Sequence, residues 1–444
     1  MASMQDLLDG ICTHARRAAN PAHRTLHEGL ARNAISQRGC DPEAEALLSK
    51  SVKLEPTNAA AWNALGECFA KKGEVKGARS CFANAVKNGA KRGDPARARA
   101  LRCHSILLRK AAPGETHAEL AQNTKEAIVR TKAAIACDMD DGESWYLLGH
   151  GYLKLFFAMT HHHNDLDRAQ NAFRQGLTKA RASLRAWCRR GGSSIVGGGG
   201  GGSTGGGAKT LAGAIGAGAG GALPEYVPDM YYNHGLIHRF LENWSDAAVS
   251  LRRGRALVPH IVDAAAAKQH LGWTESLDEL ERYVARTAEL VNRRAKVKPK
   301  RLQKIAKALA KASVPKGVGS VELVPFGALG TGPKANVGKA VACRLLMPLN
   351  SSSFNVPTTF VFLDGAQGCA AVSVYSVSDA VFGRVRESDT VVLLHPELRE
   401  VTYTARDGTV HAYRSVQLVN PAQFLVNGKV LRSVGAHAAL ATSS

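Results

Sequence analysis

The stretch AAAWNALGECFAKKGEVKGARSCFANAVKNG, residues 59–89, carries the spacing that decides the fold. Its large and small side chains recur three or four residues apart, first in one group and then in a second. They are Trp62, Leu65, Gly66 and Phe69, followed by Ala78, Phe82 and Ala85. Small residues let two antiparallel helices approach, and large residues fill the space between them. The stretch therefore predicts a pair of packed antiparallel helices.

The same spacing recurs along the chain. Residues 41–56 supply the second helix of an earlier repeat, and 95–112 and 117–136 supply two helices of a degenerate one. Two further sets match: Trp145, Leu148, Gly149, Tyr152, Ala169 and Phe173, then Tyr231, Gly235, His238, Ala247, Leu251 and Pro259. This is the pattern of the tetratricopeptide repeat. The sequence therefore predicts a multidomain chain that begins with an all-α tetratricopeptide-repeat solenoid over residues 1–292.

The run GGGGGGSTGGGAKT, residues 197–210, interrupts this solenoid. A phosphate-binding loop needs G-x-x-x-x-G-K-[ST] between a buried strand and a helix. Here Ser203 and Ala208 occupy the two glycine positions, and the residues that follow hold five glycines before the next proline, too many for a stable helix. Between 191 and 221, 16 of 31 residues are glycine. We expect a disordered inserted loop over 191–223, with no nucleotide and no other cofactor.

A basic segment follows the solenoid. The stretch RRAKVKPKRLQKIAKALAKASVPK, residues 293–316, holds ten Lys or Arg and no acid, and its second half is helical in composition after a break at Pro299. Such a charge binds the phosphate backbone of RNA or DNA, although a solvated linker is the plainer alternative. The candidate RNA-binding residues are Lys296, Lys298, Lys300, Arg301 and Lys304. We expect a basic linker helix over 293–318.

The character of the chain changes to short alternating strands from Ser320 onward, with glycine or proline in the turns between them. Strands of this number and spacing predict an all-β OB-fold barrel over 319–432, with a two-sheet sandwich as the alternative. A flexible tail is expected over 433–444. Three aromatic residues could form a base-stacking platform, but core packing is the favoured role; they are Phe360, Phe362 and Tyr375.

Charge and cysteine content limit the function classes. The 58 Lys and Arg against 37 Asp and Glu give a net charge of +21, which favours anionic partners. Nine scattered cysteines with no CxxC pair argue against a disulfide scaffold and a zinc ribbon, and suit a reducing compartment. No run of about 18 apolar residues is found, so we expect no membrane association and a cytoplasmic and nuclear location.

Neither a metal site nor a catalytic site stands out. The turn His161–His163, with Asp165 and Asp167, could ligate a metal, but it lies in an enlarged repeat turn and a solvated loop is favoured. No nucleophile elbow, HExxH motif, kinase motif set or Cys/His arrangement is found. We expect a protein that is not an enzyme and holds no metal.

The concave face of the solenoid is the expected binding surface. In such repeats the first helix of each pair lines this face. The candidate peptide-binding residues are Asn63, Arg109, Glu143, Tyr146, His150, Asp229, Tyr232 and Arg239, with Glu67, Lys71 and Lys154 beside them. Mixed charges with two tyrosines suit an extended peptide that carries both signs of charge. The alternative for any one of them is a salt bridge between repeats.

The order of these parts resembles the tetratricopeptide repeat protein 5 (Strap) family. The resemblance rests on AEALLSKSVKLEP, AWNALGECFAKKGEVKGA, DGESWYLLGHGYL, KVKPKRLQK and FLVNGKV. It implies an adaptor that reads the N-terminal Met-Arg-Glu-(Ile/Cys) of nascent tubulin at the ribosome and triggers tubulin mRNA decay through mRNA-decay adaptors. The second role that it implies is nuclear, as a stress-responsive cofactor of an acetyltransferase coactivator, with the OB-fold contacting protein or nucleic acid.

The resemblance also assigns residues. It places Arg109 and Asp229 at positions that hold the nascent peptide, Arg109 facing its glutamate and Asp229 its arginine. It places Lys298, Lys300 and Arg301 at basic positions that face ribosomal RNA. Two features depart from the family pattern: the glycine insertion just before the helix of Asp229, and the enlarged histidine turn.

Overall fold

The computed structural model describes residues 42–88, 95–160, 163–191, 226–257, 272–293, 297–314, 320–332, 334–349, 357–375 and 385–430. Most of the expected glycine insertion, the tail over 433–444, and Lys296, His161 and His162 lie outside them. The chain divides into two compact units, Met1–Leu155 and Phe156–Ser444. The expected domain boundaries at 292/293 and 318/319 stay a prediction.

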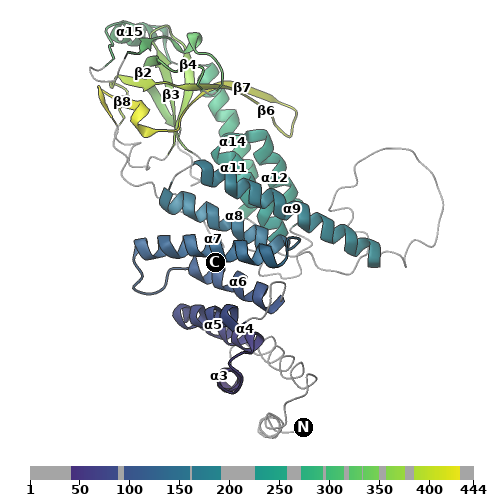
Figure 1. The fold of residues 1–444 in the computed structure, drawn as a ribbon. Coiled ribbons are helices and arrows are strands. Elements are labelled where there is room, and N and C mark those ends of the chain that lie inside the picture. The colour runs from purple at the N-terminus through teal and green to yellow at the C-terminus, as the bar shows by residue number, and fades with distance from the viewer. Residues whose placement is uncertain are drawn as a thin grey trace, which may run out of the picture. The chain divides into compact units, whose positions relative to one another are not determined.

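The described part of the first unit consists of helices (Figure 1). They are α3 (Pro42–Leu54), α4 (Ala59–Lys71), α5 (Val75–Asn88), α6 (Pro95–Leu108), α7 (His117–Cys137) and α8 (Gly142–Leu155). Local signals fix their ends: the Asn58 side chain accepts from Ala61 N before α4, and Thr116 forms a capping box with Glu119 before α7. Consecutive helices pack in pairs, α4 with α5 and α6 with α7.

The small residues of the repeat pattern act as expected. A Cβ on Gly66 would lie 2.9 Å from the Phe82 ring, so only glycine lets α4 and α5 approach this closely. In the second unit Gly235 faces Leu251 at the same 2.9 Å. The helix pairing that the spacing predicts is confirmed at both places.

The second unit begins with helices and ends with a sheet. The helices are the π-helical η1 (Phe156–Thr160), then α9 (His163–Gly191), α11 (Tyr226–Phe240), α12 (Trp244–Leu257), α14 (Gly272–Asn292) and α15 (Pro299–Leu309). Pro299 stands in the first turn of α15, where its missing N–H leaves no helical hydrogen bond unmade. The break that the sequence predicts at this proline is therefore the start of a helix.

The strands form one mixed sheet. They are β1 (Glu322–Leu323), β2 (Lys339–Leu349), β3 (Thr358–Asp364), β4 (Cys369–Val374), β5 (Val391–Leu394), β6 (Glu397–Thr404), β7 (Val410–Leu418), β8 (Phe424–Val426) and β9 (Lys429–Val430). Their order is β6-β7-β4-β3-β2-β5-β8-β9, with β1 pairing β2 in parallel. Only the β4–β7 and β1–β2 pairs are parallel among the described strands.

The sheet curls around its own core. Phe362 on β3, Val416 on β7 and Phe424 on β8 belong to one buried cluster, although β7 and β8 lie far apart in the strand order. A flat sheet could not bring these side chains together. The opposite face packs on α12, α14 and α15 through a second cluster that includes Leu280, Leu302 and Tyr413. The structure thus has one curled sheet in place of the two-sheet sandwich.

A buried glutamate joins the α11–α12 turn to the sheet. The Glu242 side chain is 6% exposed, and its carboxylate accepts hydrogen bonds from Ser373 Oγ (2.6 Å), Ser415 Oγ (3.2 Å) and Gln417 Nε2 (2.7 Å). Its φ is 59°, a region that favours glycine. A glutamate is kept there because its side chain reaches three donors on two strands.

The cysteines are mostly unpaired thiols. Those described as free are Cys81, Cys103, Cys137, Cys343 and Cys369. Cys68 differs, because it is disulfide-bonded. The sequence predicts cysteines without disulfide bonds, and among the described residues this holds at those five positions but not at Cys68.

Candidate functional site

Three of the predicted peptide-binding residues meet in the first unit. Arg109 follows the last residue of α6, and Tyr146 and His150 lie one turn apart on α8. The Tyr146 and His150 rings pack edge to face with centroids 4.5 Å apart. Lys154, one turn further on, donates from Nζ to the carbonyl oxygen of Arg109. The Arg109 guanidinium donates from Nε to Ser105 O at 3.3 Å. We call Arg109, Tyr146, His150 and Lys154 the arginine cluster.

Burial shapes the charge of this cluster. It lowers the pKa of Arg109 to about 10, partly offset by Tyr146, and leaves the guanidinium charged at neutral pH. Burial and, to a smaller extent, the positive charge of Arg109 lower the pKa of His150 to about 3, so the imidazole is neutral. The pKa of Lys154 is lowered by burial and then by Arg109. Two cations therefore share a half-buried place beside a neutral ring, and a carboxylate would relieve their repulsion.

The other two predicted residues of this unit are tied to neighbouring helices. Asn63 is buried, and its Nδ2 donates to Ala96 O at 2.8 Å, joining α4 to the start of α6. Glu143 lies 3.3 Å from Arg102, which also pairs with Asp141 at 2.6 Å. Burial raises the pKa of Glu143, with Arg102 acting in the opposite direction. These contacts fit the alternative of bridges between repeats, and peptide binding by the two residues stays a prediction.

The second unit places its three predicted residues differently. Asp229 lies half-buried in the first turn of α11, where a carboxylate is favoured by the helix dipole. Tyr232 is half-buried against the cluster beneath the sheet. Arg239 is 2% exposed and pairs with Glu279 on α14 at 3.4 Å, and burial lowers its pKa. In the structure Arg239 forms a salt bridge between α11 and α14. A role of Arg239 in peptide binding stays a prediction.

The histidine turn is described only from His163 onward. Burial lowers the pKa of His163, whose ring packs 5.6 Å from that of Tyr375. Asp165 is buried and accepts from Thr160 Oγ1 at 2.8 Å, and Asp167 is exposed. In the part of the chain that the structure covers, no group of three metal-ligating side chains is found.

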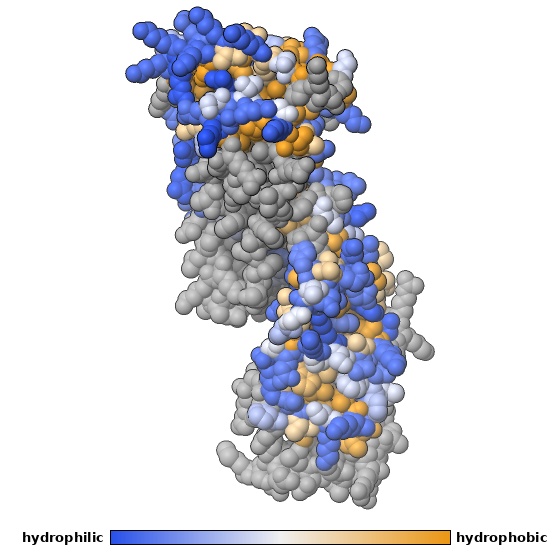
Figure 2. Space-filling view, turned by 90° about the vertical axis from the view of Figure 1, so that its left-hand side faces the viewer, coloured by the Kyte–Doolittle hydropathy of each residue, from blue (hydrophilic) through white to orange (hydrophobic). Residues whose placement is uncertain are grey.

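The basic segment forms an amphipathic helix. Leu302, Ile305 and Leu309 bury one side of α15 against β2 and β3. Exposed cations lie on the rest of the helix and at its two ends: Lys300, Arg301, Lys304 and Lys307 within α15, Lys298 just before it and Lys311 just after it. Arg301 also pairs with Glu387. Figure 2 shows hydrophilic residues beside hydrophobic ones at the top of the view, the height at which α15 is drawn in Figure 1.

The aromatic residues of the sheet are core residues. Phe360 and Phe362 are 0% exposed and Tyr375 is 1% exposed. Phe360 and Phe362 pack with Phe424, and the Tyr375 hydroxyl accepts from Gln417 Nε2 at 3.1 Å. No base can stack on them, so the favoured interpretation as core packing is confirmed.

Comparison with known proteins finds one family to which most of the chain is similar. The model of the Tetratricopeptide repeat protein 5 OB fold domain matches residues 320–440. Tetratricopeptide repeat protein 5 of Mus musculus is 28% identical over 403 residues, covering 87% of this chain and 76% of the relative. The Homo sapiens protein of the same name is 28% identical over 401 residues with the same coverage. The chain is thus similar to tetratricopeptide repeat protein 5 along most of its length, and its residues 320–440 match the OB fold domain of that protein.

Two solved structures resemble the chain distantly. YrrB, titled a TPR protein with an unusual peptide-binding site, has a TM-score of 0.30 and 16% identity, covering 54% of this chain and 96% of YrrB. A MamA double mutant has a TM-score of 0.30 and 14% identity, covering 58% of this chain and 94% of that one. Likenesses this distant carry no weight for function.

The match to the OB fold domain, together with the helices and strands of the structure, confirms the expected fold class, helical repeats followed by an OB-fold. It supports a protein-binding adaptor and favours a binding protein over an enzyme. No helix in the described ranges is long and apolar enough to cross a membrane.

Sequence reasoning missed two charged residues that organise these regions, Arg102 and Glu242. Arg102 follows Arg99 by three residues, so the two share one side of their helix, and this spacing was the available signal. Nothing local marks Glu242, because its partners lie 131 to 175 residues away in sequence.

Proposed function

We propose that this chain is an adaptor that binds the N-terminal Met-Arg-Glu-(Ile/Cys) of nascent tubulin at the ribosome. Through mRNA-decay adaptors it then triggers decay of the tubulin mRNA being translated. The proposal extends the protein-binding role of the family to one peptide, and its site of action is the cytoplasm, with a further presence in the nucleus.

The arginine cluster is the observation that carries the proposal. Arg109 and Lys154 present two cations in a half-buried place, beside the uncharged His150 and the Tyr146 ring. The glutamate of the peptide supplies the missing negative charge, and a guanidinium can hold a carboxylate with two parallel hydrogen bonds. The tyrosine face suits the apolar side chain that follows the glutamate.

Asp229 is the proposed partner of the peptide arginine. It is the acidic residue in the first turn of α11 and is half-buried, so its attraction for a cation is less screened than at an exposed site. An arginine that pairs with it would gain a charge-assisted hydrogen bond.

The exposed side of α15 is the proposed contact with ribosomal RNA. Its cations lie on one face of a helix whose other face is held on the sheet, so they form a fixed basic surface. The basic segment, residues 293–316, contains no aromatic side chain that could stack on a base. We therefore expect contacts to phosphates, with steep salt dependence and no reading of base sequence.

Co-sedimentation with ribosomes that display nascent tubulin tests the proposal. Charge reversal at Lys298 and Lys300 should reduce binding at least about tenfold, since each phosphate contact adds to the salt-dependent affinity. Asp229→Ala should reduce binding as well. Reversal at Lys76 and Lys125, two exposed lysines of the first unit, changes the net charge equally and should have little effect.

Unchanged binding after the Lys298, Lys300 and Asp229 substitutions would contradict the proposal. Tight binding of free DNA through the sheet domain at physiological salt would support instead the nuclear role, as a stress-responsive cofactor of an acetyltransferase coactivator.

A further inference from the structure

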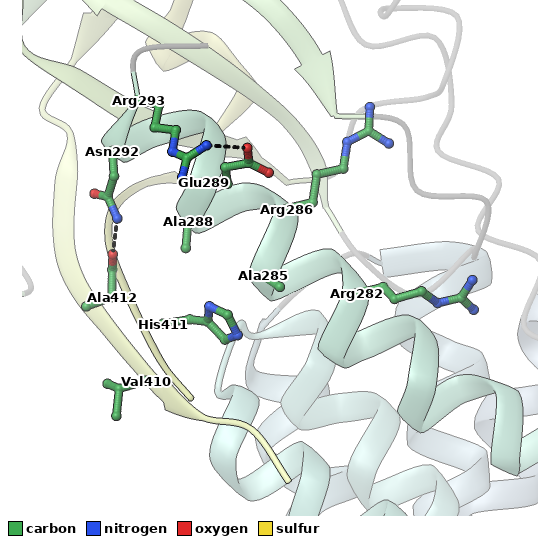
Figure 3. A pocket seen from close by; sticks show the side chains of 10 residues that line it. All are labelled: Arg282, Ala285, Arg286, Ala288, Glu289, Asn292, Arg293, Val410, His411 and Ala412. Carbon is green, nitrogen blue, oxygen red and sulfur yellow. Dashed lines mark hydrogen bonds and ion pairs between the residues drawn. The ribbon is translucent and has the colours of Figure 1, made fainter. Parts of the chain in front are cut away.

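A groove runs between the second half of α14 and the start of β7, both in the second unit. It encloses about 550 Å³, and its floor and walls come from residues 282–293 and 410–412. Figure 3 shows His411 reaching from the strand toward α14, with the Asn292–Ala412 and Arg293–Glu289 contacts at one end. None of these residues belongs to the arginine cluster or to α15.

Three arginines stand along one side of the helix. Arg282, Arg286 and Arg293 follow each other at four and seven residues, so they form a row that is about 16 Å long at 1.5 Å per residue. All three are exposed. Glu289 pairs with Arg293 at 3.2 Å. Three arginines against one glutamate leave the lining of the groove positively charged.

The strand side of the groove is an open sheet edge. In the antiparallel β6–β7 ladder, successive residues of β7 alternately hydrogen-bond to β6 and point their backbone groups away from it. Ala405 N donates to Thr409 O, so Thr409 and His411 face β6, and the backbone groups of Val410 and Ala412 point away from β6. The partner on the other side, β4, pairs with β7 only from Ser415 onward. Asn292 Nδ2 donates to Ala412 O at 2.8 Å, which confirms the direction of that carbonyl.

The remaining lining suits a peptide backbone. Ala285 and Ala288 lie on α14 between the arginines and β7, and their short side chains leave room for a peptide backbone. Val410 is 60% exposed and offers an apolar contact at the groove mouth. Phenylalanine, tyrosine and tryptophan are absent from the residues that line the groove, so nothing but His411 could stack on a base.

We propose that this groove binds an extended acidic peptide of a partner protein. The peptide lies along β7, bonds to the backbone N–H and carbonyl of Val410 and to the N–H of Ala412 in the manner of an added strand, and places its carboxylates on Arg282 and Arg286. A row of about 16 Å accommodates about five extended residues at 3.3 Å each. This site is independent of the proposed tubulin-peptide contact and would let the adaptor hold a second protein.

Fluorescence anisotropy of the full chain with the labelled peptide Glu-Val-Glu-Val-Asp-Glu tests this site. In an extended chain its first, third and fifth residues put three carboxylates on one face, and both valines lie on the other. Combined Arg282→Glu and Arg286→Glu should weaken binding about tenfold or more. Combined Arg253→Glu and Arg255→Glu, at two exposed arginines of α12, makes the same charge change away from the groove and should weaken binding less than twofold.

A backbone variant separates strand addition from charge alone. Val410→Pro removes an N–H that faces the groove and leaves every arginine in place, so it should weaken the peptide severalfold while thermal unfolding stays cooperative. Equal loss in the two arginine pairs, or no detectable binding, would overturn the proposal. The proposal would also be overturned if a ten-nucleotide poly(U) displaced the peptide and its affinity fell more than that of the peptide on Arg282→Glu and Arg286→Glu. The groove would then be a phosphate-binding site.

Discussion

Arg109 in the first unit and Glu242 in the second are both charged side chains taken partly or wholly out of water, yet their surroundings differ. Glu242 receives three side-chain hydrogen bonds from the sheet. In the described residues, the Arg109 guanidinium makes one side-chain hydrogen bond, from Nε to Ser105 O, and its charged neighbour is a second cation. A buried charge that the fold satisfies holds structure together, whereas one that the fold leaves partly unsatisfied is suited to a ligand.

The largest effect on stability is expected at Glu242. Glu242→Ala leaves donors on Ser373, Ser415 and Gln417 without their acceptor and should lower the free energy of unfolding by about 3 kcal/mol. Urea denaturation of the variant measures this. Glu322→Ala, at an exposed glutamate of β1, serves as the control and should change stability by less than about 0.5 kcal/mol. A loss below about 1 kcal/mol at Glu242 would contradict its structural role.

The same residue predicts a pH dependence. Burial raises the pKa of Glu242 above its ordinary value of 4.5, despite its hydrogen bonds. The folded state therefore holds the proton more tightly than the unfolded state, so this group's contribution to stability is fully present below pH 4.5 and is lost as pH rises through the raised pKa. Glu242→Gln does not titrate and should flatten that fall in a series of melting temperatures. If the melting temperatures of the parent chain and of Glu242→Gln changed in parallel with pH, the titration of Glu242 would not be the cause of the fall.

Arg239 gives a smaller effect and sharpens the comparison. If its pair with Glu279 is structural, Arg239→Met should cost about 2 kcal/mol of unfolding free energy, less than at Glu242 because Glu279 can regain water. The affinity for a Met-Arg-Glu-Ile peptide should then stay within about twofold in the folded variant. Weaker peptide binding at unchanged stability would instead support the predicted role of Arg239 in the binding surface.

His150 should have the smallest effect. Its pKa is lowered to about 3, chiefly by burial, so the folded state disfavours the proton and stability is lost as pH falls from the unfolded value near 6.5 toward 3. His150→Gln should change stability little at pH 7 and should lose about 1 kcal/mol less than the parent chain at pH 5.5. Guanidinium denaturation at the two pH values measures the difference. Equal losses in both proteins would show that His150 is protonated in the folded state.

The helical repeats could be predicted from the sequence because their contacts are local. Gly66 and Phe82 lie 16 residues apart, within one helix pair, and their spacing alone signals the close approach that the structure has. The break at Pro299 is equally local. The strand pattern likewise indicated a β region, although the register and the β4–β7 parallel pairing depend on the packing of the whole sheet.

The candidate site was predictable only in part. The repeat positions singled out Tyr146 and His150, and Arg109 was expected beside them from the preceding degenerate repeat; in the structure the three lie together. The same positional rule included Asn63, Glu143 and Arg239, which pair with neighbouring helices. A position on a helix face says which way a side chain points. It does not say whether a partner from another helix already occupies it.

Peptide binding by Arg109 is the central claim, and fluorescence anisotropy with labelled Met-Arg-Glu-Ile and Met-Arg-Gln-Ile peptides tests it most directly. Arg109→Ala should weaken the glutamate peptide about tenfold or more, as expected for a lost charge-assisted pair, and should barely affect the glutamine peptide. The free energy of unfolding should fall by less than about 1 kcal/mol. Equal weakening of both peptides, or unchanged affinity for the glutamate peptide, would contradict the account.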